Sequence, residues 1–500
     1  MTLLIKSVQV LGSPLKLPER VDVFINGDRI SAIGNFPDKK ADFIFDGQGA
    51  YLAPGFIDVN TDSDHYLSLF DDPAQGDFLS QGVTTIVGGN CGSSLAPLIY
   101  GSLESVQKWG NINKVNVDWH TIAEFLKLIE KRPLGVNFLT LVGHSTIRRA
   151  LIGGTLRDLT KNELGVFSET LKRGLGEGAS GFSTGLGYVH SHQTPYAEIK
   201  LLVNIVRESG GVYSTHLRNN GPELKASIDE TIRVSEETGA KVLISHFLPL
   251  KGVEKEYEEA LETIERLPGD RDFHFDIYPF DTSVIPLYKF LPDWVQNGGI
   301  EVMVSNVLDK WLEPRIVKDL PKIAPYDFII GQATDNTAFV GKSLRDLMEL
   351  YSLQDPREAL MKLMITTKLR ASIHFKNINT SLVNKGLIHR RSFIASNSAS
   401  TKEGKGVKKL ERTTSTFTKF LSLVQDEKIM SLEDAIRKIT LLPARKFNVE
   451  RRGEIKEGNF ADLTCFRGSE IKLTVVNGQV AYMDGMIHDK SAGRPLRSHG

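Results

Sequence analysis

Short apolar runs alternate with longer amphipathic segments through the middle of the chain, which is typical of repeated parallel β/α units. The apolar runs are bounded by glycine, proline or polar residues and each is short enough to be a buried strand. Eight such candidate strands occur, at residues 52–59, 82–89, 135–143, 179–186, 211–217, 241–247, 272–280 and 391–396. Eight parallel strands are the number that closes a TIM (β/α)8 barrel, so the pattern predicts an α/β protein of that class.

Both ends of the chain have a different texture, in which short β-type segments are broken by Gly, Pro and Asp. The Asn-Gly pairs at Asn26 and Asn477 are typical of tight hairpin turns. We therefore expect one small β-sandwich domain built from both termini, residues 1–55 and 445–500, with the barrel in residues 56–444.

The interval between the seventh and eighth candidate strands is too long for a plain loop. It contains helical patterns of its own, which predict an inserted subdomain or lid within residues 285–385 that shapes the entrance to a pocket. Elsewhere, Gly210 and Gly239 are predicted to end helices, and Ser431 to begin one with Asp434 three residues later. The lysine-rich segment 402–409 is expected to be a mobile, solvated loop.

The composition of the chain limits the partners that can be expected. The 500 residues are 41% hydrophobic and carry 61 basic and 61 acidic side chains, so the formal net charge is zero. This balance gives no electrostatic reason to expect nucleic acid or an anionic membrane as a partner, and a small-molecule substrate is the better expectation. With two cysteines, no signal-peptide pattern and no long apolar run, a soluble cytoplasmic protein is expected.

In a barrel, the carboxyl ends of the strands converge on one pocket. Candidate residues at these ends include Cys91, His216 and His246. One thiolate and two imidazoles with an open fourth position are the ligand set of a catalytic zinc site. Each histidine taken alone is more often a hydrogen-bonded structural residue, but the three together favour a metal.

Other polar residues have simpler interpretations. Cys465, in the terminal β-segment, is expected to be buried packing. His144 is expected to be structural, and two pairs are expected to be solvated loop residues, namely His190 with His192 and Asp64 with His65.

Taken in order, a set of motifs resembles the N-acyl-D-amino-acid deacylases (D-aminoacylases) of the amidohydrolase superfamily. The motifs are PGFID, GVTTIVGGNCGSSLAP, VGHSTIRRALIG, EGASGFSTGL, YSTHLRNN, ISHF, DIYPF and RRGEIKEGNFADLTCF. The resemblance covers most of the chain and thins between about residues 285 and 385. It implies a TIM barrel beside a small β-sandwich, and about one zinc ion per chain held by Cys91, His216 and His246. It also implies attack of activated water on the amide of an N-acyl-D-amino acid.

The chain departs from the family at several positions. Asn60-Thr61-Asp62 stands where the family has His-x-His, and Asn397 stands at the position of the family's general-base aspartate. An amide cannot accept a proton at neutral pH, so Asn397 cannot take over that role. Leu248 and Leu410 replace a family lysine and histidine, whereas Tyr278 and Arg412 are retained and are implied substrate contacts.

Asp62 is the one carboxylate that could compensate, either by ligating the metal or by holding the attacking water; the alternative is a solvated loop acid. Three functions follow from these residues. The first is a divergent zinc amidohydrolase that cleaves an N-acyl or related C–N bond. The second is a catalytically inactive protein of this fold that binds metal or ligand or acts as a scaffold. The third is another superfamily reaction, such as cyclic amide opening or deamination.

Overall fold

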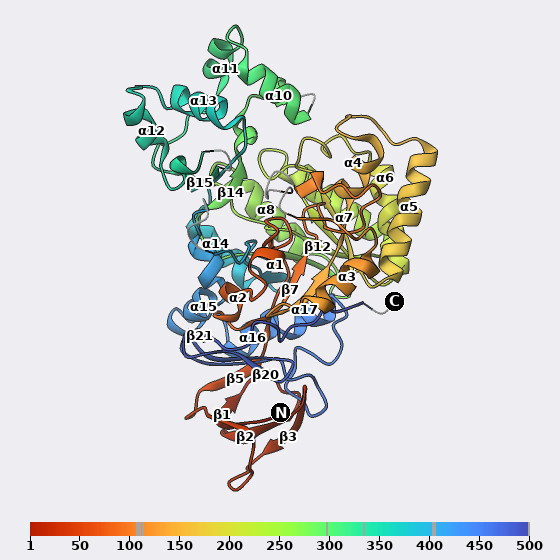
Figure 1. The fold of residues 1–500 in the computed structure, drawn as a ribbon, viewed down its shortest axis with the longest axis vertical. Coiled ribbons are helices and arrows are strands. Elements are labelled where there is room, and N and C mark those ends of the chain that lie inside the picture. Colours follow the sequence, from red (N-terminus) through yellow and green to blue (C-terminus); the bar gives the residue numbers. More distant parts are fainter. Residues whose placement is uncertain (107–111, 113–114, 297–298, 334–335, 403–406, 499–500) are drawn as a thin grey trace.

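The computed structural model describes residues 1–500 except 107–111, 113–114, 297–298, 334–335, 403–406 and 499–500. Figure 1 shows three parts, with the β-strands of both termini at the bottom, the parallel strands and their helices in the middle, and an inserted unit at the top. Among the described helices, none has the length and apolar character to cross a membrane.

The parallel strands follow one another in chain order, which confirms the predicted α/β class. One sheet pairs β6, β7 and β8, and another pairs β9 through β13 and ends on β17. Every candidate strand has a counterpart: β6 (Phe56–Asp58), β7 (Val83–Gly88), β8 (Asn137–Thr140) continued by β9 (Val142–Gly143), β10 (Gly181–Gly185), β11 (Val212–His216), β12 (Lys241–Ile244), β13 (Phe273–Ile277) and β17 (Ser392–Ile394).

Two connections link these sheets. The chain passes from β8 to β9 through Leu141, whose backbone N–H donates to the Gly88 carbonyl at 3.0 Å. At the other side, the residues that follow β6 and β17 meet, because the Asn397 N–H donates to the Asn60 carbonyl at 2.9 Å. The first and last parallel strands are therefore neighbours at their carboxyl ends.

The predicted first strand, residues 52–59, is in fact two strands that meet at Gly55. β5 (Tyr51–Pro54) pairs with β1 and β18 in the terminal sheet, and only β6 pairs with β7. A Cβ on Gly55 would lie 2.2 Å from Thr84 Oγ1, so the chain changes sheets at a residue that has no room for a side chain.

Helices pack outside the parallel strands and begin and end as the sequence indicates. α6 ends just before Gly210, α7 is capped by Gly239 in the left-handed conformation, and the Ser431 hydroxyl accepts from the Asp434 N–H. The helices are α1 (Ser68–Asp71), α2 (Gly76–Leu79), α3 (Ile122–Lys131), α4 (His144–Ile152), α5 (Lys161–Gly176), α6 (Tyr196–Glu208), α7 (Leu224–Thr238), α8 (Glu254–Glu265), α14 (Thr380–Ile388), α15 (Glu411–Asp426), α16 (Leu432–Ile439) and α17 (Leu441–Lys446).

Strands from both termini share one sheet. β1 belongs to both halves of it: its first residues pair with β2 and β4, and its last residues pair with β5. A bulge between Ile5 and Val8 separates the halves, and bulges bend strands. Apolar side chains from both halves form one buried cluster that includes Cys465, as expected for that cysteine. The strands are β1 (Thr2–Val10), β2 (Val21–Asn26), β3 (Arg29–Gly34), β4 (Phe43–Asp46), β5, β18 (Leu463–Arg467), β19 (Glu470–Val476), β20 (Gln479–Met483) and β21 (Met486–Ile487).

The long interval after β13 folds as a unit with its own apolar core. Its antiparallel strands pair in the order β14-β16-β15. Its elements are β14 (Ser283–Pro286), α9 (Asp293–Gln296), α10 (Gly299–Leu308), α11 (Glu313–Asp319), β15 (Phe328–Ala333), α12 (Leu344–Leu350), α13 (Pro356–Thr367) and β16 (Ala371–Phe375).

The lysine-rich segment 402–409 lies partly outside the described residues. Its described end is not simply solvated, because the Lys408 N–H donates to the Gly331 carbonyl of β15 and Lys409 pairs with Asp77 at 2.9 Å.

Candidate metal and catalytic site

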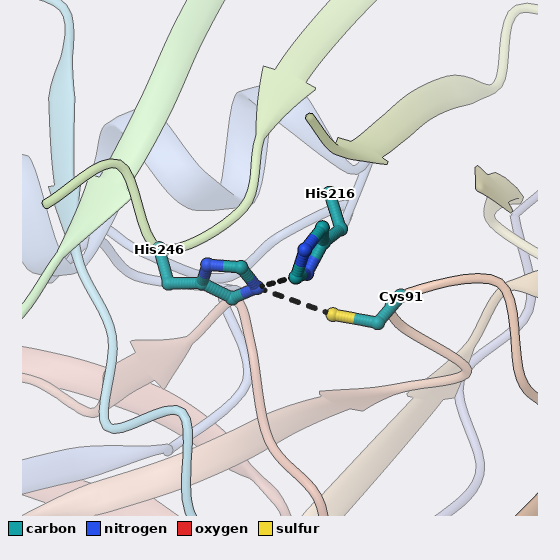
Figure 2. A group of neighbouring side chains, drawn as sticks. All are labelled: Cys91, His216 and His246. Atoms are coloured by element: carbon teal, nitrogen blue, oxygen red, sulfur yellow. Dashed lines mark hydrogen bonds between the residues drawn. The ribbon is translucent and has the colours of Figure 1, made fainter. Parts of the chain in front are cut away.

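The three predicted metal ligands come together at the carboxyl ends of the parallel strands. Cys91 follows β7, His216 is the last residue of β11, and His246 follows β12. Cys91 Sγ lies 3.4 Å from His246 Nε2, and His216 Nδ1 lies 2.9 Å from the same nitrogen. The candidate ligand atoms of all three lie within 4.8 Å of one another, and Figure 2 shows them pointing toward one point.

Unusual backbone conformations aim two of these side chains. Cys91 has φ of 52° and His246 has φ of 38°, in the left-handed region that non-glycine residues seldom adopt. Strained residues of this kind cost roughly 1–3 kcal/mol each and persist where the surroundings hold them. The Asp276 carboxylate holds one of them by accepting from the His246 N–H at 2.8 Å.

The loop that carries Cys91 depends on glycines. Gly89 and Gly92 have φ of 77° and 79°, so the backbone turns through the left-handed region on both sides of the cysteine. A Cβ on Gly92 would lie 2.7 Å from the Gly185 backbone nitrogen. The loop therefore packs directly against the end of β10.

The donor set fits zinc. A thiolate and two imidazoles are ordinary zinc ligands, and bond lengths of about 2.0–2.3 Å in a tetrahedron place ligand atoms roughly 3.3–3.8 Å apart. The sulfur and the His246 nitrogen already have such a separation, and the two ring nitrogens need to part by only a few tenths of an ångström. Burial lowers the pKa of His246 to about 4, so its ring is neutral at pH 7, as a ligand must be.

Asp62 lines the same pocket. Among the described residues, it is not part of the group of three whose ligand atoms all lie within 4.8 Å of one another. Its side chain is only 18% exposed and its Oδ1 lies 3.0 Å from His65 Nδ1. The interpretation of Asp62 as a solvated loop acid is therefore wrong. Burial raises its pKa, but the hydrogen bond and charge of His65 and the charge of Arg412 outweigh burial, so the pKa of Asp62 is lowered.

Asp64 and His65 are also not solvated, contrary to the prediction from the sequence. Both are fully buried, at 1% exposure each. The Asp64 Oδ2 accepts from the Gly89 N–H at 2.6 Å, and His65 Nε2 lies 3.0 Å from the Ser93 carbonyl oxygen. These two residues thus contact both ends of the loop that carries Cys91.

Asn397, Tyr278 and Arg412 lie close together in the lining of the same pocket. Arg412 is 3% exposed, donates from Nη2 to the Asn397 carbonyl at 2.8 Å, and lies with its guanidinium carbon 4.6 Å from the centre of the Tyr278 ring. Asn397 has φ of 45°, so the end of β17 is also held in the left-handed region. No described carboxylate lies within salt-bridge distance of Arg412.

The remaining histidines take different roles. His144 is buried with Nε2 2.8 Å from the Glu198 carboxylate, which agrees with the expected structural role. His192 is exposed as expected, but His190 is half-buried and stacks on Tyr188, which in turn lies 4.8 Å from the His216 ring centre.

The pocket has a volume of about 950 Å³ and is lined both by loops that follow the parallel strands and by the inserted unit. From the inserted unit come Val284 on β14, and Lys289 and Asp293 after it. Lys289 Nζ donates to the Gly187 carbonyl at 2.5 Å, and burial lowers its pKa while the charge of Asp293 opposes that effect. The sequence analysis did not identify Lys289, because no motif marks a lysine in the short 3-10 helix η3 (Leu287–Phe290) after β14.

Known proteins resemble the chain along almost its whole length. Residues 336–481 match the model of the amidohydrolase family. The D-aminoacylase of Alcaligenes xylosoxydans xylosoxydans is 29% identical over 95% of this chain and 93% of its own. The N-acyl-D-aspartate deacylase of the same organism is 28% identical over 93% of this chain and 86% of its own.

Among solved structures, the N-acyl-D-glutamate deacylase of Bordetella bronchiseptica matches with a TM-score of 0.81 at 24% identity, covering 99% of each chain. That protein was solved with zinc and with a phosphonate inhibitor that mimics a tetrahedral intermediate. The chain therefore has the overall fold of this deacylase. The resemblance to the N-acyl-D-amino-acid deacylases that the sequence motifs predicted is confirmed.

Proposed function

We propose that this relative of the D-aminoacylases is a zinc-dependent hydrolase that cleaves the amide bond of an N-acyl amino acid or a similar small polar molecule. The observation that carries the proposal is the convergence of Cys91 Sγ, His216 Nδ1 and His246 Nε2 within 4.8 Å of one another at the floor of a pocket. Zinc held by these residues would polarise the amide carbonyl and lower the pKa of the attacking water.

In this proposal, Asp62 is the general base. Its pKa is lowered, so it is ionised at neutral pH, and the contact with His65 is made through Oδ1. Its Oδ2 accepts no hydrogen bond from the described residues and is free to take the proton of the attacking water. Asn397, at the end of β17, donates hydrogen bonds but cannot accept that proton.

The cations of the pocket favour a substrate with a carboxylate. Arg412 is buried without a described carboxylate partner, and a buried charge of this kind is costly until a partner binds. Its guanidinium carbon lies 4.6 Å from the centre of the Tyr278 ring, its Nε donates no hydrogen bond to the described residues, and a planar guanidinium is suited to bind a carboxylate. Lys289, from the inserted unit, offers a second cation for another acceptor group of the substrate.

The architecture that presents this site is a closed (β/α)8 barrel in residues 56–444, with a β-sandwich domain in residues 1–55 and 445–500. The hydrogen bond from Asn397 to Asn60 supports closure between the first and last strands. The insertion within residues 285–385 shapes the entrance, and its contribution of Lys289 to the pocket supports that role.

The test combines metal analysis with a substrate panel. Zinc-loaded protein is incubated with N-acyl-D- and N-acyl-L-amino acids, dipeptides, cyclic amides and amino-purines, beside Cys91→Ser. Cys465→Ala is the matched control, because Cys465 is the other cysteine and is buried in the terminal sheet. About one zinc per chain and amide hydrolysis are expected in the wild type and in Cys465→Ala, and both should be lost in Cys91→Ser.

Other results would separate the alternatives. One zinc per chain without turnover of any compound would favour a metal-binding protein that is catalytically inactive. Turnover confined to the cyclic amides or amino-purines would favour another reaction of the superfamily.

A further inference from the structure

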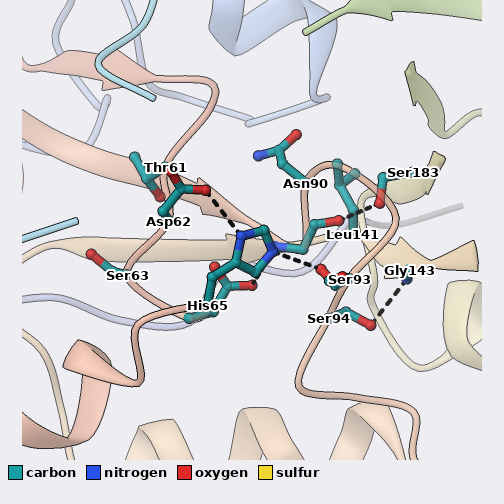
Figure 3. Close-up of polar contacts among 12 residues, drawn as sticks. Thr61, Asp62, Ser63, His65, Asn90, Ser93, Ser94, Leu141, Gly143 and Ser183 are labelled. Atoms are coloured by element: carbon teal, nitrogen blue, oxygen red, sulfur yellow. Dashed lines mark hydrogen bonds and ion pairs between the residues drawn. The ribbon is translucent and has the colours of Figure 1, made fainter. Parts of the chain in front are cut away.

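A polar chain of contacts joins the proposed base to the loop that carries the metal-binding cysteine. Figure 3 shows His65 between Asp62 and Ser93, with one ring nitrogen directed to each. The Nδ1–Oδ1 distance to Asp62 and the Nε2–O distance to Ser93 are both 3.0 Å. Because His65 is buried, water does not replace either contact.

The partners of His65 fix its protonation. A carboxylate and a backbone carbonyl can only accept hydrogen bonds, and a neutral imidazole has only one N–H to donate. Both ring nitrogens of His65 must therefore carry a proton, which makes the ring a cation. Asp64 Oδ2 lies 4.0 Å from Nε2, and burial raises the pKa of this carboxyl group while the charge of His65 opposes that effect.

The electrostatic environment agrees with this geometry. Burial lowers the pKa of His65, but the charge of Asp64 and the hydrogen bond to Asp62 outweigh it and raise the pKa to about 9. No described basic side chain is within salt-bridge distance of Asp62 or Asp64 except His65. The histidine thus stabilises the ionised form of the buried Asp62 carboxylate and opposes the effect of burial on Asp64.

Asp64 and His65 also clamp the cysteine loop at both ends. Asp64 Oδ2 accepts from the Gly89 N–H at 2.6 Å, and His65 contacts the carbonyl of Ser93. Cys91 lies midway between these two points, with φ of 52°. A strained loop keeps such a conformation only where the surroundings determine it.

We infer that His65 is a positioning residue that orients the Asp62 carboxylate and, with Asp64, holds the loop that presents the Cys91 sulfur. The inference rests on the proposed function for the role of Asp62, but not for the role of the loop. His65 touches neither substrate nor metal in this account and acts through its two neighbours. Replacing His65 should therefore have two separable effects, one on the affinity for zinc and one on turnover.

The experiment uses His65→Gln, which removes the charge and one of the two ring contacts, beside the control His488→Gln at an exposed site. Zinc affinity is measured by competition with a chromophoric chelator, and circular dichroism checks the fold. Groups that orient metal ligands typically contribute 10–100-fold to affinity. We expect zinc to bind about 10-fold or more weakly to His65→Gln and unchanged to His488→Gln.

Turnover is measured on the same variants together with Asp62→Asn and the double variant, at saturating zinc. His65→Gln is expected to lower kcat at least 10-fold with KM changed little. In the Asp62→Asn background, His65→Gln should have little further effect on kcat, because the carboxylate that His65 orients is already absent. Independent, multiplicative losses in the double variant would overturn the role toward Asp62.

The protonation of His65 can be measured directly in the wild-type protein, where no substitution can disturb the fold. NMR of ¹⁵N-histidine-labelled, metal-free protein at pH 7.5 should show one buried ring with both nitrogens protonated, and His65→Gln should lack that signal. A neutral His65 ring, or zinc affinity within twofold of wild type in His65→Gln, would overturn the inference. If the wild type hydrolyses no amide, the proposed function fails, while the affinity and NMR results still decide the role of His65.

Discussion

At the scale of single residues, the site keeps some groups of the deacylase motifs and has other residues in place of the rest. Cys91, His216 and His246 are brought within reach of one ion. The eighth-strand position holds Asn397, which cannot act as a base. We therefore propose Asp62 as the group that accepts the proton, a carboxylate in the loop after β6 that lines the same pocket.

Replacing Asp62 by asparagine keeps the shape of the side chain and removes the base. General bases typically contribute about a hundredfold to ten-thousandfold, so kcat should fall by about that factor while KM changes little. Steady-state kinetics on the best substrate of the panel provide the measurement. Asp71→Asn, an exposed aspartate in α1, is the control. Equal kcat for Asp62→Asn and wild type would remove Asp62 from the mechanism.

Lys289 should act in recognition. Lys289→Met keeps most of the buried stem and removes the charge, so KM for substrates with a second acidic group should rise about 10-fold or more. Neutral substrates should be affected much less. The measurement is kcat/KM for N-acyl-aspartate or N-acyl-glutamate, compared with kcat/KM for N-acyl-leucine. The control is Lys251→Met, because Lys251 is exposed and lies outside the pocket lining. Equal losses for acidic and neutral substrates would contradict a specific contact.

The sequence predicted that Cys91, His216 and His246 converge, because each lies at or just after the end of a recognisable apolar strand. It did not predict the roles of Asp64 and His65, because they lie in an irregular loop where no periodicity separates buried from exposed positions. Their burial is set by contacts with Gly89 and Ser93, which are distant in sequence.

At the scale of elements, the sequence predicted helix boundaries correctly where a specific capping residue marks them. Gly239 and Ser431 end and begin helices as predicted, because a left-handed cap and a side-chain N-cap are local interactions. Residues 52–59 were predicted as one strand and form two, because an apolar run carries no sign of which sheet it joins. That choice depends on pairing with β18, more than 400 residues away in sequence.

The cap of α16 is a direct test at this scale. Ser431→Ala removes the hydroxyl that accepts from the Asp434 N–H at 3.1 Å, and loss of such a cap costs about 1 kcal/mol. The free energy of unfolding in urea should fall by about that amount. Thr414→Ala, an exposed position inside α15, should cause no comparable loss. An unchanged unfolding midpoint for Ser431→Ala would show that the cap adds nothing to stability.

At the scale of the whole molecule, two of the three parts line the pocket. Cys91, His246 and Asp62 lie in loops after parallel strands, and His216 ends β11. The inserted unit adds Lys289 and Asp293, whereas the terminal sheet pairs with the chain just before β6. The α/β class and the shared sheet of both termini could be predicted from the texture of the sequence. The contribution of the inserted unit to the pocket could not, because it arises from tertiary packing.

Stability should also depend on pH through His374 of β16. Burial and the charges of Arg412 and Lys408 lower its pKa from 6.5 to about 3. Between these values the unfolded chain binds a proton that the folded chain does not, so stability falls as pH falls below 6.5. His374→Gln should reduce the slope of unfolding free energy against pH between 6 and 4 by up to about 1.4 kcal/mol per pH unit. An unchanged slope would place the ring in a more polar environment.

The most direct test of the central claim is X-ray absorption at the zinc edge on protein loaded with one equivalent of zinc. Zinc held by Cys91, His216 and His246 should show one sulfur scatterer at about 2.3 Å and imidazole nitrogens at about 2.0 Å. The sulfur signal should vanish in Cys91→Ser and persist in Cys465→Ala. A zinc shell with only oxygen and nitrogen ligands in the wild type would contradict the assignment of Cys91, His216 and His246 as a metal site.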